Sequence, residues 1–175
     1  LSFLPGGLAV ASVGGAALFS AAAGSSLACA AAMGRIAVPE MLKRKYDPGL
    51  STAVVAAAGT MGSLIPPSIL LIIYGIFAEV AISKLFLAAI VPGLLTMLGY
   101  AAVIIIRVRI NPELAPPLDE RSAWSERFEA LGETWPLLLL VLGVFGGLFS
   151  GFFTPTQAGA VGAALSFVIA AARGT

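Results

Sequence analysis

Long apolar runs separated by short polar stretches dominate the chain. Four runs contain no charged residue, and they cover residues 4–33, 48–78, 85–106 and 136–172. About 20 apolar residues in a helix cross a hydrocarbon core of ~30 Å. The pattern therefore predicts an all-α integral membrane protein, a polytopic bundle of helices.

The first run is too long for a single crossing and carries a polar break. As one helix, residues 4–33 would extend about 43 Å. Gly24, Ser25 and Ser26 interrupt it. We expect a re-entrant helical hairpin, in which Gly24 allows a tight turn and Ser25 or Ser26 caps the second arm. A single tilted helix with a small-residue packing face is the alternative.

The second run, residues 48–78, predicts a discontinuous helix. Asp47 and Pro48 suit a helix start, as N-cap carboxylate and first helical residue. Two glycines and a Pro-Pro pair lie in residues 59–68, where a continuous helix is disfavoured. Each half would cover half the bilayer. Unpaired backbone at that depth is tolerated only within protein or along a cavity, which makes the break a candidate ion or substrate site.

The remaining segments complete a division into residues 1–110, 111–135 and 136–175. Residues 85–106 predict one membrane-spanning helix, in which Pro92 and Gly93 could introduce a kink. Residues 111–135 predict an interfacial linker with a short amphipathic helix, marked by Trp124, Phe128 and Leu131. Residues 136–175 predict the start of a second membrane repeat that bends, re-enters or forms two elements. Its break is formed by Thr154, Pro155 and Thr156.

Charge adds a topology and excludes several functions. Lys43, Arg44 and Lys45, and later Arg107 and Arg109, mark two loops as cytoplasmic. The chain is 59% hydrophobic, carries a net charge of +1, and contains no histidine and one cysteine. These features argue against an enzyme, a cofactor, a metal cluster and nucleic-acid binding. Because apolar sequence begins at residue 1 and runs almost to the end, we expect a fragment of a longer polytopic chain.

The two breaks share one chemistry. Half-helix N-termini carry partial positive charge and free amides that suit a carboxylate, whereas unwound carbonyls and hydroxyls suit a sodium ion. We expect the two breaks to converge. The candidate sodium and substrate residues are Gly24, Ser25, Ser26, Gly59, Thr60, Gly62, Pro66, Pro67 and Ser68. The alternative is a non-transporting membrane scaffold whose glycines serve packing only.

Residues 59–69 closely resemble the GTLGxxIPPSI signature of the large membrane subunit of TRAP transporters, the DctM-like family. Three other stretches are similar to that family in the expected order. They are the first hairpin tip (Gly24 to Ser26 with Ala30, Ala31, Met33 and Gly34), the linker Asn111 to Leu114, and residues 151–158, which resemble GxFTPTEAAAV. The resemblance covers essentially the whole chain.

This resemblance implies a sodium-coupled secondary carrier of the bacterial inner membrane, built from inverted repeats and moving by an elevator mechanism. It also implies a small membrane subunit and a periplasmic binding protein as partners, and organic acids such as C4-dicarboxylates or sialic acid as substrates. Other hairpin-type anion symporters remain an alternative. Gln157 stands where the family commonly has glutamate, so a role for that carboxylate is in doubt. Ser63 replaces a usually apolar residue. The substrate, the number of sodium ions and the choice between sodium and protons stay open.

Overall fold

The computed structural model describes residues 4–116 and 135–173, and both stretches are helical without a strand. This confirms the all-α prediction. The amphipathic helix expected around Trp124, Phe128 and Leu131 lies outside the described residues. The elements in chain order are α1 (Gly7–Ala23), α2 (Ser26–Lys43), α3 (Pro48–Gly59), the 3-10 turn η1 (Thr60–Ser63), α4 (Ile69–Phe77), α5 (Ile82–Ile110), η2 (Pro112–Leu114), α7 (Trp135–Phe149) and α8 (Pro155–Arg173).

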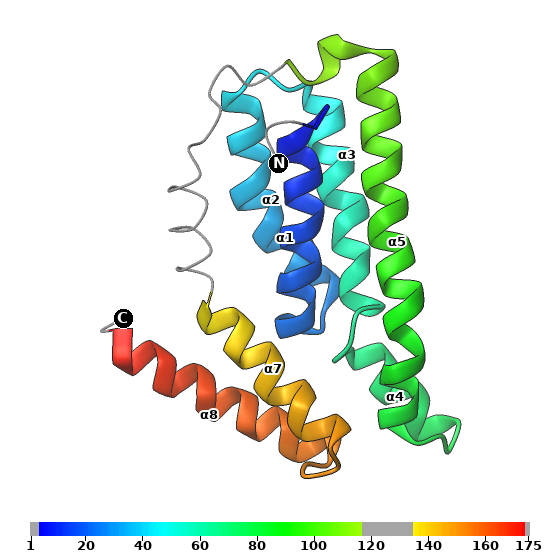
Figure 1. Ribbon diagram of the computed structural model, residues 1–175, viewed down its shortest axis with the longest axis vertical. Helices are drawn as coiled ribbons and strands as arrows, with labels where there is room; N and C mark the ends of the chain where they lie inside the picture. The colour runs from blue at the N-terminus through cyan, green and yellow to red at the C-terminus, as the bar shows by residue number, and fades with distance from the viewer. Residues whose placement is uncertain (1–3, 117–134, 174–175) are drawn as a thin grey trace.

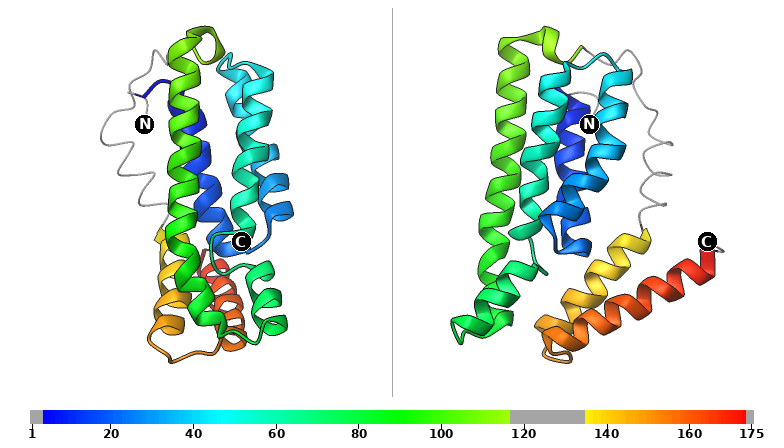
Figure 2. Two further views of the ribbon diagram at one scale, coloured as in Figure 1. Left: turned by 90° about the vertical axis from the view of Figure 1, so that its right-hand side faces the viewer. Right: turned by 180° about the vertical axis from the view of Figure 1, so that it is seen from behind.

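Helices α1, α2, α3 and α5 lie side by side along the long axis of the molecule (Figure 1). Helices α1 and α2 form a hairpin that packs on α3, and α1 also contacts α5. Helices α7 and α8 form a second hairpin at the lower end of Figure 1, where α7 contacts α1 (Figure 2). The molecule is therefore an upright bundle with an oblique hairpin beneath it.

Small side chains let the first hairpin approach α3 closely. The core between these helices is lined by Ala9, Ala16, Ala37 and Ala58, with Met41 fully buried among them. Alanine at a helix interface shortens the distance between backbones, which raises van der Waals contact where no hydrophobic drive exists in lipid. The alanine-rich runs thus specify close packing.

The basic end of the bundle is held by local capping and by one long-range tie. Asp47 accepts a hydrogen bond from the Leu50 amide (2.8 Å) and starts α3, as predicted. The Asp47 amide donates to the Leu114 carbonyl (2.9 Å), which joins the α2–α3 loop to η2. Both basic loops therefore lie at the same end of the molecule.

Tyr46 adds a second tie at this end. The Leu8 amide donates to its hydroxyl at 3.3 Å. Burial raises the pKa of the Tyr46 phenol, an effect opposed by the Leu8 amide and by Arg44. The hydrogen bond from Leu8 anchors the loop after α2 to the first turn of α1.

Helix α2 is longer than the sequence pattern indicated. The hairpin was expected to end at residue 33, but α2 continues to Lys43 through residues predicted to be a polar stretch. Glu40 pairs with Arg44 (3.0 Å) and Lys43 (3.9 Å), at spacings of four and three residues. Such pairs lie on one helix face and support polar turns that protrude beyond the apolar run.

Helix α5 has 29 residues, and in the described part of the chain it alone is long and apolar enough to cross a membrane. It continues through Pro92 without interruption. Its outer side chains are open, with Leu95 64% and Leu98 59% exposed. An exposed apolar face of this size fits contact with lipid rather than with water.

Candidate functional site

The tip of the first hairpin is a left-handed turn followed by a serine cap. Gly24 has φ +62°, a conformation in which glycine carries no steric cost, and its amide donates to the Ser20 carbonyl (2.9 Å). Ser25 is extended, and its Oγ accepts from the Ala28 amide at 3.4 Å. The predicted turn at Gly24 and the predicted N-cap at Ser25 are both confirmed.

The second break begins where α3 tightens into η1 and ends at Ser68. The Ser68 side chain is fully buried, and its hydroxyl donates to the Ser63 carbonyl at 2.6 Å. Pro66 and Pro67 lie between these two residues and are joined by a cis peptide bond. The serine hydroxyl thus satisfies a carbonyl that the interrupted helix leaves without its usual partner.

The two breaks meet in one junction, as the sequence predicted. The Ile69 amide at the start of α4 donates to the Gly24 carbonyl at the hairpin tip (3.1 Å). A Cβ at Gly62 would lie 2.6 Å from the Ser25 carbonyl oxygen, and a Cβ at Gly24 would lie 2.5 Å from the Pro67 carbonyl oxygen. Only glycine permits these approaches. We call the contact of residues 24–26 with residues 62–69 the junction.

Gly59 serves the same close approach one turn earlier. A Cβ there would lie 2.7 Å from the Cβ of Ala30 on α2. The hairpin arm and the end of α3 are therefore in backbone contact next to the junction. The junction contains six candidate residues: Gly24, Ser25, Ser26, Gly62, Pro67 and Ser68. Gly59 packs beside it, and Pro66 is joined to it through the cis bond to Pro67.

Thr60 is the exception. Its hydroxyl donates to the Ala57 carbonyl (2.7 Å) and lies 3.0 Å from the hydroxyl of Tyr100 on α5. In a 3-10 turn, side chains three residues apart share a face, so Thr60 leaves η1 on a different side from Gly62. Its hydroxyl is turned toward α5 and not toward the hairpin tip.

Tyr100 was missed by the sequence analysis. A phenol within an apolar run needs a hydrogen-bond partner when water is excluded, and that was the available signal. The sequence could not indicate which partner, because 40 residues separate Tyr100 from Thr60.

The chemical groups at the junction are neutral. Ser25 and Ser26 supply hydroxyls, the unwound segment supplies carbonyls, and the first turn of α2 presents amides that lack a helical acceptor. In the described part of the chain no cluster of three histidine, cysteine, aspartate or glutamate side chains is suited to a metal ion. Neutral oxygen ligands suit a hard monovalent cation, and helix amides suit an anion.

The Thr154, Pro155 and Thr156 break lies elsewhere, at the turn between α7 and α8 (Figure 1). The Thr154 amide donates to Oε1 of Gln157 (2.9 Å), and the Gln157 amide donates to Oγ1 of Thr154 (3.3 Å). This reciprocal pair is a capping box. Gln157 thus performs the capping that a glutamate would perform, and the break starts α8.

The comparisons with known proteins agree on one family. The family described as "Tripartite ATP-independent periplasmic transporter, DctM component" matches residues 3–174. A C4-dicarboxylate TRAP transporter large permease protein of Vibrio cholerae is 42% identical over 166 residues, which cover 94% of this chain and 36% of that protein.

Relatives with other named substrates match the same region. An ectoine TRAP transporter large permease protein of Halomonas elongata is 37% identical over 161 residues, covering 91% of this chain and 37% of that protein. A sialic acid TRAP transporter permease protein of Haemophilus influenzae is 34% identical over 169 residues, covering 97% of this chain and 27% of that protein. The chain thus spans 36%, 37% and 27% of the length of these three relatives. These relatives are transporter permeases, in agreement with the prediction that the chain is not an enzyme.

Proposed function

The chain belongs to the family of DctM components of tripartite ATP-independent periplasmic transporters, and we propose that it forms part of the ion and substrate site of a sodium-coupled organic-acid importer. The observation that carries this proposal is the junction. There, two helix breaks from different parts of the chain bring their hydroxyls, carbonyls and free amides to one place.

The depth of the junction supports a site within the bilayer. A Cβ at Gly93 would lie 3.3 Å from Ile65 of the break, and Tyr100 bonds Thr60 at its start. Both α5 residues are at least ten residues, or about 15 Å, from either end of that helix. If α5 crosses the membrane, the break lies near the midplane and the first hairpin re-enters from the basic side. That side is cytoplasmic by the excess of lysine and arginine.

In the proposed site, sodium binds first and prepares the site for the substrate. Sodium held by neutral oxygens would add a positive charge beside the free amides of α2, and both would favour a substrate carboxylate. A membrane site without fixed charge avoids the cost of a bare ion when it is empty. An elevator movement would then carry the junction, as one packed unit, across the membrane.

We infer the substrate class and the partners from the relatives of this chain. The relatives are named for C4-dicarboxylate, isethionate, ectoine and sialic acid. We propose a small organic acid delivered by a periplasmic binding protein, with a small membrane subunit completing the complex in the bacterial inner membrane. The remainder of the longer permease would supply a second hairpin and a second broken helix.

The close glycine contacts also favour a second candidate function, a non-transporting membrane scaffold. Gly59 and Gly62 lie against Ala30 and Ser25 so tightly that packing alone would explain them. A non-transporting scaffold needs these glycines but does not need the Ser25 hydroxyl for anything except the helix cap.

Thermal unfolding of the full-length permease in sodium and in choline, at equal ionic strength, separates these functions. A ligand that binds the native state raises its apparent stability by mass action. We expect a sodium-specific rise in Tm of a few degrees, and Ser25→Ala should reduce it. Because Ser25→Ala also removes an N-cap, which costs about 1 kcal/mol, Asp47→Ala is the matched control. It removes the cap of α3 and should leave the sodium-dependent rise intact.

Equal sodium-dependent rises in Tm in Ser25→Ala and Asp47→Ala would show that the Ser25 hydroxyl is not part of the ion site. Equal Tm values of the wild type in both salts would count against a sodium site in the substrate-free state. Repeating the measurements in sodium and in choline with a C4-dicarboxylate present would then show whether sodium binds only together with the substrate. Equal Tm values in that experiment too would favour the non-transporting scaffold.

A further inference from the structure

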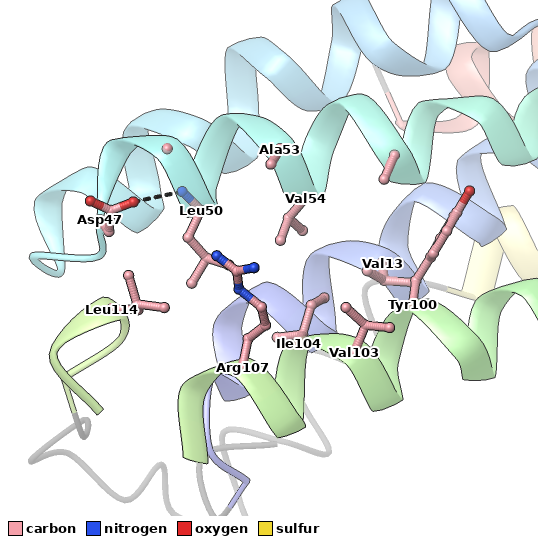
Figure 3. A pocket seen from close by; sticks show the side chains of 12 residues that line it. Val13, Asp47, Leu50, Ala53, Val54, Tyr100, Val103, Ile104, Arg107 and Leu114 are labelled. Carbon is pink, nitrogen blue, oxygen red and sulfur yellow. Dashed lines mark hydrogen bonds between the residues drawn. The ribbon is translucent and has the colours of Figure 1, made fainter. Parts of the chain in front are cut away.

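A groove between α3 and α5 lies apart from the junction and has its own chemistry. It has a volume of about 410 Å³ and is lined mostly by apolar side chains of α1, α3 and α5, with Leu114 of η2 at one end. From Asp47 to Ala57 it follows ten residues of α3, or about 15 Å. Figure 3 shows Arg107 reaching across one end toward Leu50, with Asp47 beyond it and Tyr100 at the other end.

The charged end of the groove carries one cation and one anion that form no ion pair with each other. Arg107 is exposed, and its guanidinium makes no hydrogen bond or ion pair with another described residue. Asp47 uses Oδ1 to cap α3 and is not within 4.0 Å of a cationic group in that part of the chain. Glu40, the nearest acid on α2, is already paired with Arg44 and Lys43. The groove therefore offers a separated positive and negative charge above an apolar channel.

We propose that this groove binds one phosphatidylethanolamine molecule, with its phosphate on Arg107, its ammonium on Asp47 and one acyl chain along the groove toward Tyr100. Charge complementarity selects this lipid. An arginine guanidinium forms charge-assisted hydrogen bonds with phosphate oxygens, and a primary ammonium donates to a carboxylate. Phosphatidylglycerol lacks the ammonium, and phosphatidylcholine carries a quaternary ammonium without an N–H donor.

The placement of the groove agrees with a lipid. Its charged end lies at the basic end of the bundle, and its apolar part runs beside α5, whose outer face is exposed. Headgroup and chain would then match the interface and the hydrocarbon core. The inference depends on the proposed membrane orientation and is independent of sodium coupling or transport.

Native mass spectrometry of the full-length permease tests the headgroup. The probes are phosphatidylethanolamine, phosphatidylglycerol and phosphatidylcholine with identical acyl chains, added to delipidated protein. We expect phosphatidylethanolamine to bind best. Arg107→Gln should weaken all three lipids about fivefold, since each carries a phosphate. Asp47→Asn, which keeps an N-cap residue, should abolish the preference over phosphatidylcholine.

Matched variants distinguish binding in the groove from binding elsewhere on α5. Arg109 lies at the same end of α5 but does not line the groove, so Arg109→Gln should leave binding unchanged. Val103→Trp would fill the groove and should reduce binding of all three lipids, whereas Ala102→Trp, on the opposite side of α5, should not.

Equal effects of Arg107→Gln and Arg109→Gln would overturn the proposal. So would a wild type that retains no lipid while Val103→Trp, but not Ala102→Trp, impairs folding of the full-length permease. That result would show that another protein segment fills the groove. Sodium-dependent stability that persists in all these variants would keep the proposed transport function separate from the lipid site.

Discussion

At the scale of single residues, glycine decides whether the junction can form. Gly62 touches the backbone of Ser25 and Ser26, and an added Cβ would lie 2.6–2.7 Å from three of their atoms. Backbone cannot move aside as the end of a flexible side chain can. Gly99 on α5 differs, because a Cβ there would meet nothing within 4 Å.

We expect Gly62→Ala to destabilise the protein and Gly99→Ala not to. Gly62→Ala should destabilise the full-length permease by about 1–3 kcal/mol, the usual cost of overpacking. Gly99→Ala should be neutral or stabilising by up to about 1 kcal/mol, since alanine is the better helix former. Tm in detergent measures both. Equal losses of Tm would show that the close backbone contact at Gly62 does not set the cost of the added methyl group.

The residue scale also shows where sequence analysis succeeds. Gly24, Ser25, Asp47 and Pro48 were predicted because turns and caps are local: the groups that bond lie within four residues of each other. The bond from Ile69 to Gly24 joins residues far apart in the chain, so only the convergence of the breaks was expected, and not its geometry.

At the scale of elements, helix boundaries follow from capping more than from hydropathy. Helix α8 starts at a capping box in which Gln157 and Thr154 satisfy each other's amides. The sequence analysis treated Gln157 as a departure that left the role of a carboxylate in doubt. The structure shows that an amide oxygen is sufficient for this cap, because glutamine and glutamate present the same acceptor to the N-cap amide.

Substitution at Gln157 tests this interpretation. Gln157→Glu should keep the stability of the full-length permease within a few tenths of a kcal/mol, whereas Gln157→Ala should cost about 1 kcal/mol. Tm and hydrogen exchange of the Thr154 amide report the two effects. A loss in Gln157→Glu as large as that in Gln157→Ala would mean that the side-chain bond does not stabilise the start of α8.

Element lengths were the weaker part of the sequence-based expectation. Glycine, serine and proline located both breaks, but hydropathy ended the first hairpin ten residues too early. Charged side chains on the last turns of α2 were taken as a polar stretch. Hydropathy averaged along the sequence does not detect ion pairs along one face of a helix. The partnership of Thr60 and Tyr100 was hidden for a related reason, since it joins two helices side by side.

At the scale of the whole molecule, one geometric fact organises the bundle. The ends of α2 and α5 and the start of α3 all lie at the basic end, as the bond from Asp47 to Leu114 requires. A full crossing by α5 then places the loop before Ile82 on the opposite side of the membrane. The hairpin of α1 and α2 begins and ends on the basic side and turns at the level of the junction.

Cysteine labelling in intact cells tests this arrangement. Glu113, in η2 at the basic end, and Ala81, just before α5, are both exposed. The native Cys29 is buried and should not react. A membrane-impermeant maleimide should label Ala81→Cys from outside and label Glu113→Cys only after the membrane is permeabilised. Labelling of both from outside would mean that α5 does not cross the membrane. The junction would then lose its place at the midplane, and with it the reason why unwound backbone there would serve an ion.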